Sequence, residues 1–254
     1  MTRRFTPLLA LFVAVMLGGA RDPILVPEVS QHEINLQQGF TGTELLLFGA
    51  ILTPEGSRAA QDYDIVVVLK GPTQSVVLRE KQKFAGIWIN ASSIELRSAP
   101  SYYAIASSRP IADIVDDKTA AIYELGLQWL QLSPIGAIDP EEQARFAAGL
   151  VQRNVRAGLY REDEGGVTVS EQVLYQARIG LPSSVPTGIY TAETFAISKG
   201  RVVASASSQV EVRKLGVERA IASFADNYGF AYGLLAMFVS VAMGWLAGRL
   251  FALV

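Results

Sequence analysis

A run of 22 residues without a charged side chain, Asn227 to Gly248, constrains the fold of this chain more than any other feature. As an α-helix the run would be about 33 Å long, close to the thickness of a bilayer's hydrocarbon core. Tyr228 and Tyr232 near one end and Trp245 near the other match the aromatic belts at membrane interfaces. The alternative is a buried core helix, for which apolar runs of about 10–14 residues are typical. The run therefore predicts a transmembrane helix.

The N-terminus has the layout of a secretory signal peptide. Arg3 and Arg4 come first, an apolar run from Leu8 to Leu17 follows, and Gly18-Gly19-Ala20 supplies small residues for cleavage. The alternative is an uncleaved second anchor, but the apolar run is short for a bilayer span. A signal at the front and an anchor at the back predict an N-terminus outside the membrane and a C-terminus inside. Arg249 on the inner side agrees with this orientation.

The composition of the segment between these two ends excludes several classes of protein. Residues 21–226 carry 19 basic and 24 acidic side chains, a net charge of −5, so nucleic acid is not an expected partner. The absence of cysteine excludes disulfides, thiol catalysis, iron–sulfur clusters and a lipoprotein anchor. An exported domain of about 200 residues without disulfides depends on its hydrophobic core, and this length is sufficient for one.

Many short apolar or alternating segments bounded by glycine and proline predict a mainly β domain. The clearest hairpin joins residues 188–197 to 202–212 through a turn at Lys199-Gly200. Strands are also expected at 30–36, 44–52, 63–70, 102–106, 159–161 and 167–181, with a further hairpin that pairs 76–82 with 84–89. Such a series is typical of an immunoglobulin-like β-sandwich. The pattern leaves open whether there is one sandwich or two.

Two helices are predicted as an insertion between these groups of strands. The first covers residues 116–132, and the second begins at Asp139, a capping residue followed by Pro140, and closes at Gly158. Their buried faces are predicted to consist of Ile122, Leu125, Trp129 and Leu132 in the first helix and Phe146, Leu150 and Val155 in the second.

Helical periodicity begins again at Val217, and that stretch either lies along the membrane surface or continues the anchor helix. The whole chain then divides into six predicted segments. The segments are a signal peptide (1–20), sandwich strands (21–110), the helical insertion (111–158), strands that complete the domain (159–214), a juxtamembrane helix (215–228) and the transmembrane anchor (229–254).

Catalytic chemistry has little support in the sequence. A nucleophile–base pair would depend on the one histidine, His32, and there is no Gly-x-Ser-x-Gly motif. The carboxylate pairs Asp62/Asp64 and Asp116/Asp117 are interpreted as a strand edge and a helix start. No metal-ligand spacing or glycine-rich phosphate motif occurs. We therefore expect no enzyme activity, no metal and no cofactor.

Two features are candidates for binding. Arg79, Lys81 and Lys83 alternate along a predicted strand, which suits an anion site or a contact with lipid headgroups, although lysines also protect edge strands from aggregation. In the anchor, small residues form a stripe that contains two glycine pairs four residues apart, a pattern of closely packed membrane helices. The stripe consists of Gly229, Gly233, Ser240, Gly244 and Gly248.

Several motifs resemble one family of uncharacterised alphaproteobacterial transmembrane proteins. They include Gly39-Phe40-Thr41-Gly42-Thr43-Glu44, Phe84-Ala85-Gly86-Ile87-Trp88-Ile89-Asn90 and Gly244-Trp245-Leu246-Ala247-Gly248. The resemblance covers nearly all of the chain that follows the predicted signal peptide. It implies no assigned activity and no site residues. It does imply a genomic neighbourhood of sulfite- or organosulfonate-exporter-like membrane proteins, which suggests a role as a transport accessory.

The first functional hypothesis is a non-enzymatic periplasmic protein, anchored in the inner membrane, that serves as an accessory subunit of an anion exporter. Its small-residue stripe would pack against a polytopic membrane partner. A periplasmic module that binds a small anion through Arg79, Lys81 and Lys83 is the first alternative. An envelope scaffold that forms homodimers through its anchor is the second.

Overall fold

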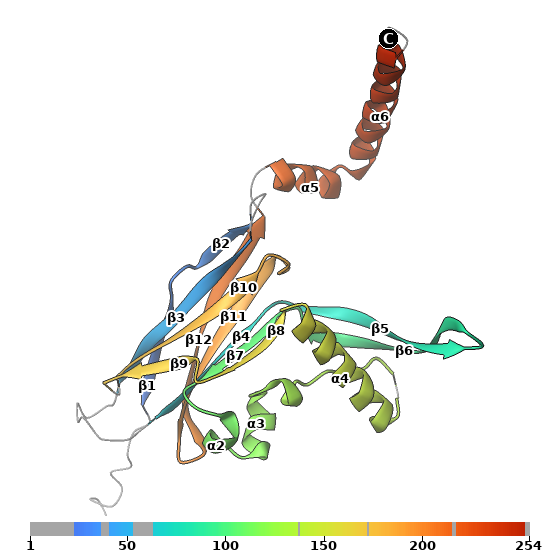
Figure 1. The fold of residues 1–254 in the computed structure, drawn as a ribbon. Helices are drawn as coiled ribbons and strands as arrows, with labels where there is room; N and C mark the ends of the chain where they lie inside the picture. The colour runs from blue at the N-terminus through green and yellow to red at the C-terminus, as the bar shows by residue number, and fades with distance from the viewer. Residues whose placement is uncertain are drawn as a thin grey trace, which may run out of the picture.

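The computed structural model describes residues 23–36, 41–52, 63–136, 138–171, 173–214 and 217–251. This part of the chain is mainly β, with a helical layer on one side and two helices at the C-terminal end (Figure 1). The expected fold class, a mainly β domain with inserted helices and a C-terminal apolar helix, is confirmed. The predicted signal peptide, residues 1–20, lies outside the described residues.

One sheet has four antiparallel strands in the order β1-β3-β10-β9. Along β10, buried and exposed side chains alternate, so this sheet has one face in the core and one in solvent. The strands are β1 (Ile24–Val29), β3 (Gly42–Leu52), β9 (Val167–Ser170) and β10 (Leu174–Pro182).

The second sheet has six strands in the order β2-β12-β11-β4-β7-β8. Its central strands β4 and β7 are apolar and buried on both faces, because the other sheet covers one face and helices cover the other. β2 is parallel to β12 and β8 is parallel to β7. The strands are β2 (Glu33–Leu36), β4 (Asp64–Lys70), β7 (Tyr103–Ser107), β8 (Tyr160–Glu164), β11 (Gly188–Ser198) and β12 (Arg201–Lys214).

The two sheets pack face to face around one hydrophobic cluster. Leu45 and Tyr175 enter it from the four-stranded sheet, and Ile65, Val67 and Val210 enter it from the six-stranded sheet. Strands from before and after the helices are neighbours within the six-stranded sheet, as β4 and β11 show. The strands of these two sheets therefore form one sandwich, which answers the question that the sequence leaves open. Its likeness to immunoglobulin domains stays a prediction.

The hairpin predicted at Lys199-Gly200 is confirmed, and it joins β11 to β12. Along β12 the even-numbered side chains from Ala204 to Val212 turn toward the core, and most of the odd-numbered ones are exposed. The alternation of apolar and polar residues in the sequence thus predicted both the turn and the buried face.

Four helical segments lie between β7 and β8 and cover the outer face of the six-stranded sheet (Figure 1). Asp139 caps the longest one, as predicted, because its carboxylate accepts a hydrogen bond of 2.9 Å from the Glu141 amide. Within that helix Phe146 and Leu150 are buried, but Val155 is exposed, contrary to the prediction. The segments are α2 (Ile111–Ile114), α3 (Asp117–Tyr123), the short 3-10 helix η1 (Leu127–Trp129) and α4 (Pro140–Arg156).

The prediction of one continuous helix over residues 116–132 is wrong. α3 stops because Glu124 adopts the left-handed conformation, with φ of +53°. That conformation lets the Glu124 carboxylate pair with Lys70 Nζ at 2.8 Å, while its carbonyl accepts a 2.6 Å hydrogen bond from the Tyr103 hydroxyl. As a result Leu125 is buried, but Ile122, which was expected on the same face, is 61% exposed.

A long two-stranded hairpin, β5 (Thr73–Phe84) and β6 (Ile87–Pro100), extends away from the sandwich (Figure 1). The hairpin predicted in this part of the sequence is confirmed, but its turn is Ala85-Gly86, so the register of the predicted pairing of 76–82 with 84–89 is wrong. Only the part near the sandwich is covered, by a third hydrophobic cluster in which Leu96 of β6 packs against Phe146 and Leu150 of α4.

The C-terminal part of the chain forms α5 (Val217–Asn227) and α6 (Gly229–Phe251). The segment Gly229–Arg249 is long and apolar enough to cross a membrane, and none of it is buried against the rest of the chain. The two helices meet at an angle at Tyr228 (Figure 1), so α5 does not simply continue the anchor helix.

Buried tyrosines make the fold sensitive to alkaline pH. Burial raises the pKa of Tyr160 and of Tyr190 from 10.0 to about 12, and it also raises the pKa of Tyr102 and Tyr103. The raised pKa values mean that the folded state favours the neutral phenols more strongly than the unfolded state does. The stability that this difference contributes is complete below pH 10.0 and is lost as the pH rises toward about 12 and beyond. We therefore expect the free energy of unfolding to fall in that range.

This expectation is tested by recording tyrosinate absorbance and the far-UV circular dichroism of the β-strands together during an alkaline titration. The buried tyrosines should ionise in the same transition that unfolds the sandwich. Complete ionisation of all tyrosines with unchanged circular dichroism would contradict it.

Candidate interaction surfaces

The small-residue stripe of α6 is uncovered in the structure. A Cβ atom added at Gly229, Gly233, Gly244 or Gly248 would meet no atom within 4 Å, apart from the helix's own nearby backbone. The hydroxyl of Ser240 donates a 2.9 Å hydrogen bond to the Ala236 carbonyl, so its polar group is satisfied within the helix. The stripe is therefore a surface on which another helix can approach the α6 backbone closely.

Aromatic side chains fix the corner between α5 and α6. The Phe224 ring lies 5.8 Å from the Tyr228 ring and 6.4 Å from the Tyr232 ring, measured between centroids. Asn227 Nδ2 donates a 2.8 Å hydrogen bond to the Ser223 carbonyl in the last turn of α5. Aromatic residues at this position fit the water–lipid boundary, where an apolar ring and a polar hydroxyl are both accommodated.

The hairpin divides into a covered base and an uncovered tip, defined here as residues 81–91. In the base, Val76 and Leu78 pack against the third hydrophobic cluster, and Glu80 pairs with Arg145 of α4 at 3.1 Å. In the tip every residue is exposed. Phe84, Ile87 and Trp88 are 70%, 68% and 66% exposed. Large exposed apolar side chains gathered in one place usually indicate an interaction site.

The register shows how the tip is arranged. Lys81 pairs with Asn90 and Lys83 with Trp88, so these four side chains share one face of the hairpin. Phe84 pairs with Ile87 on the opposite face, beside Ile89. The tip therefore has an apolar face, and a second face that carries two lysines and a tryptophan, with Lys83 directly opposite Trp88.

Arg79, Lys81 and Lys83 lie on one face of β5, as the sequence predicts, and all three are exposed. Their backbones belong to the β5–β6 ladder, but no side-chain hydrogen bond or ion pair is found for any of the three among the described residues. Successive side chains on one face of a strand are about 7 Å apart, so the three cations form a row and do not converge on one small anion. Their role in binding stays a prediction.

Both residues of the hairpin turn have positive φ, +47° at Ala85 and +85° at Gly86, which is the pattern of a type I′ turn. An alanine in this region costs about 1 kcal/mol, and asparagine tolerates it better. We expect Ala85→Asn to increase protection of the tip amides from hydrogen exchange about threefold or more, and Gly86→Ala to reduce it. Equal protection in the two variants would contradict the turn assignment.

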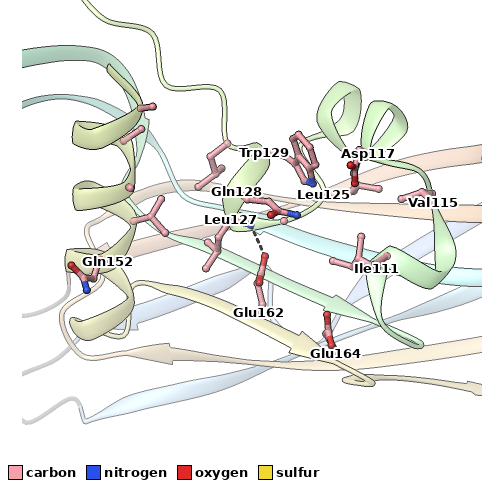
Figure 2. A pocket seen from close by; sticks show the side chains of 18 of the residues that line it. Ile111, Val115, Asp117, Leu125, Leu127, Gln128, Trp129, Gln152, Glu162 and Glu164 are labelled. Carbon is pink, nitrogen blue, oxygen red and sulfur yellow. Dashed lines mark hydrogen bonds between the residues drawn. The ribbon is translucent and has the colours of Figure 1, made fainter. Parts of the chain in front are cut away.

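A groove of about 980 Å³ lies between α4 and the segment that contains α3 and η1 (Figure 2). Its walls are mostly apolar, and Glu162 and Glu164 of β8 project into it (Figure 2). The Glu162 carboxylate accepts a hydrogen bond of 2.5 Å from the Leu127 amide, so it positions η1. The sequence does not indicate this groove, because its periodicity over residues 116–132 predicts a continuous helix, whereas the break between α3 and η1 shapes the groove.

The residues considered for catalysis have structural contacts. His32 is exposed, and its Nε2 lies 3.1 Å from Glu28 Oε1. Asp64 forms a two-armed ion pair with Arg109, with both distances 2.7 Å. Asp116 caps α3 by accepting a hydrogen bond from the Thr119 amide. Asp62 lies outside the described residues. No three histidine or carboxylate side chains gather as a metal site in the described part of the chain.

A family model described as "Putative transmembrane protein (Alph_Pro_TM)" matches residues 24–252. The chain belongs to this family. The match begins at β1 and runs to the end of α6, so the sandwich and the apolar helix are both parts of the family's architecture. No curated protein and no solved structure matches the chain. Membership of the family supports a transmembrane role for α6.

Proposed function

We propose that this protein is a non-enzymatic accessory subunit of a membrane transporter. The uncovered small-residue stripe of α6 is the observation that carries the proposal, since an apolar helix that only anchors a domain needs no such stripe. The stripe packs against a transmembrane helix of a polytopic partner. The sandwich then lies over the outer face of that partner.

The proposed orientation places the sandwich in the periplasm and the short C-terminal end in the cytoplasm. Arg249, the charged residue at the end of α6, lies on the cytoplasmic side in this arrangement, in agreement with the positive-inside tendency. The membrane in this proposal is the bacterial inner membrane, which proteins cross with apolar helices, whereas proteins of the outer membrane cross it as β-barrels.

The proposed cargo of the partner is a sulfite- or organosulfonate-type anion. This part rests on the resemblance to the family and its genomic neighbourhood. It is tested by purifying the protein from native membranes in mild detergent and identifying the associated proteins by mass spectrometry. A polytopic transporter in stoichiometric amount is the expected result. The protein alone, or only its own dimer, would overturn the proposal in favour of a self-associating scaffold.

A periplasmic anion-binding module is the second candidate: Arg79, Lys81 and Lys83 do not converge on one anion, but none of their side chains has an ion pair among the described residues, so each is open to an anion of its own. If it binds sulfite or a sulfonate, ligand should raise the unfolding temperature in a saturable and salt-sensitive manner. Reversing the charge at Lys81 and Lys83 should then remove the shift. An unchanged shift in that variant would exclude the row as the binding site.

A further inference from the structure

The tip of the β5–β6 hairpin combines exposure, apolar side chains and positive charge. Its eleven residues, 81–91, include two lysines and no acidic residue, whereas residues 21–226 as a whole carry a net charge of −5. The nearest carboxylate on β5, Glu80, is engaged by Arg145 and by the Ser92 hydroxyl. The tip is therefore a local cationic and apolar surface on an acidic domain.

This combination suits the interface of an anionic bilayer. Indole rings are enriched at the boundary between headgroups and acyl chains, and lysines beside them bind anionic headgroups. Trp88 and Lys83 are cross-strand partners, so both can occupy that boundary together. Phe84 and Ile87, at the very end of the hairpin, are the residues that would reach deepest.

The arrangement of the domain places the tip where a membrane can reach it. β12 ends at Lys214, directly before the helices that lead into the membrane. In Figure 1 a straight line from the C-terminal end of β12 to the hairpin tip has both sheets and α4 on one side, with α5 and α6 on the other. A flat surface can therefore touch both points without meeting the rest of the domain.

We propose that the hairpin tip inserts into the anionic lipid interface of the same membrane that α6 spans. The protein then has two attachment points, the anchor helix and the tip, and these fix the tilt of the sandwich over the membrane. This inference is independent of the transporter partner. The competing possibility is that the tip binds in the apolar groove of a second copy, where Glu162 and Glu164 could attract its lysines. Lipid is favoured because the anchor already holds every copy at a bilayer surface.

The chain has no cysteine, so a single introduced cysteine carries a label at one defined position. Full-length Ile87→Cys protein, labelled with the polarity-sensitive dye NBD, is reconstituted into vesicles of phosphatidylglycerol and phosphatidylethanolamine. Ile122→Cys on α3 is the matched control, since Ile122 and Ile87 are similarly exposed, at 61% and 68%. Doxyl-labelled lipids report direct contact of the dye with acyl chains.

We expect the dye at position 87, but not at position 122, to show blue-shifted emission and quenching by doxyl lipids. Adding Lys81→Glu and Lys83→Glu should reduce the quenched fraction about tenfold, as should replacing the anionic lipid with phosphatidylcholine. A dye at position 87 as water-exposed as at 122 would overturn the proposal. Blue-shifted emission that doxyl lipids leave unquenched would also overturn it, because the tip would then be covered by protein.

Discussion

Replacing Gly244 and Gly248 together with isoleucine should release the protein from its membrane partner while the sandwich stays folded. Both glycines lie on the uncovered stripe of α6. A branched side chain there keeps a neighbouring helix several ångströms farther away and removes the close backbone packing that such motifs provide. A loss of about 1–2 kcal/mol, the scale of single helix–helix contacts in membranes, corresponds to a loss of partner on co-purification of about fivefold to thirtyfold.

The matched control is Ala231→Ile with Ala242→Ile. These alanines lie about half a helical turn from the stripe, and isoleucine presents the same branched side chain at both pairs of positions. This pair should leave co-purification intact. If both pairs of substitutions release the partner, the helix as a whole is perturbed. If neither does, the stripe is not the interface, and the proposed mode of association is wrong.

Gly49→Ala should destabilise the sandwich by about 3 kcal/mol. A Cβ at this position of β3 would lie only 2.4 Å from the Val26 carbonyl oxygen, so β1 would have to move. It would also lie 2.5 Å from the Tyr175 hydroxyl, in the core between the sheets. The first of these atoms belongs to the backbone and the second to a buried side chain, so neither can move aside easily. Thermal unfolding followed by circular dichroism measures the loss.

Gly180→Ala is the control for this substitution, because Gly180 lies in β10, the strand that pairs with β3. A Cβ there would meet only an Arg161 guanidinium nitrogen, at 4.0 Å. We expect a change within about 0.5 kcal/mol, since alanine is no worse than glycine in an open strand position. Equal destabilisation by the two variants would mean that the loss does not come from the close approach at Gly49.

The sequence predicted those elements whose signals are local. Lys199-Gly200 lies between two alternating segments, and Asp139-Pro140 combines a cap with a residue suited to the first helical turn. α6 follows from length and composition alone. In each case the residues that determine the structure are neighbours in the chain, so pattern and structure agree.

The parts that were missed depend on contacts between distant residues. Glu124 ends α3 in a conformation stabilised by Lys70 and Tyr103, and nothing in residues 116–132 indicates these partners. Residues 84–89 are a continuous apolar run, like a buried strand, yet no other element packs on them in the described structure. The sequence could therefore place Arg79, Lys81 and Lys83 on one face, but it could not show that the hairpin tip is uncovered.

The most direct test of the central claim is site-specific cross-linking from the stripe in native membranes. The variant Ser240→Cys carries a benzophenone label on the stripe, and Ala242→Cys carries the same label on the opposite face. We predict that the label at position 240, but not at position 242, forms a product with a polytopic transport protein. A product at 240 that contains only a second copy of this chain, or no product at 240, would contradict the accessory-subunit function.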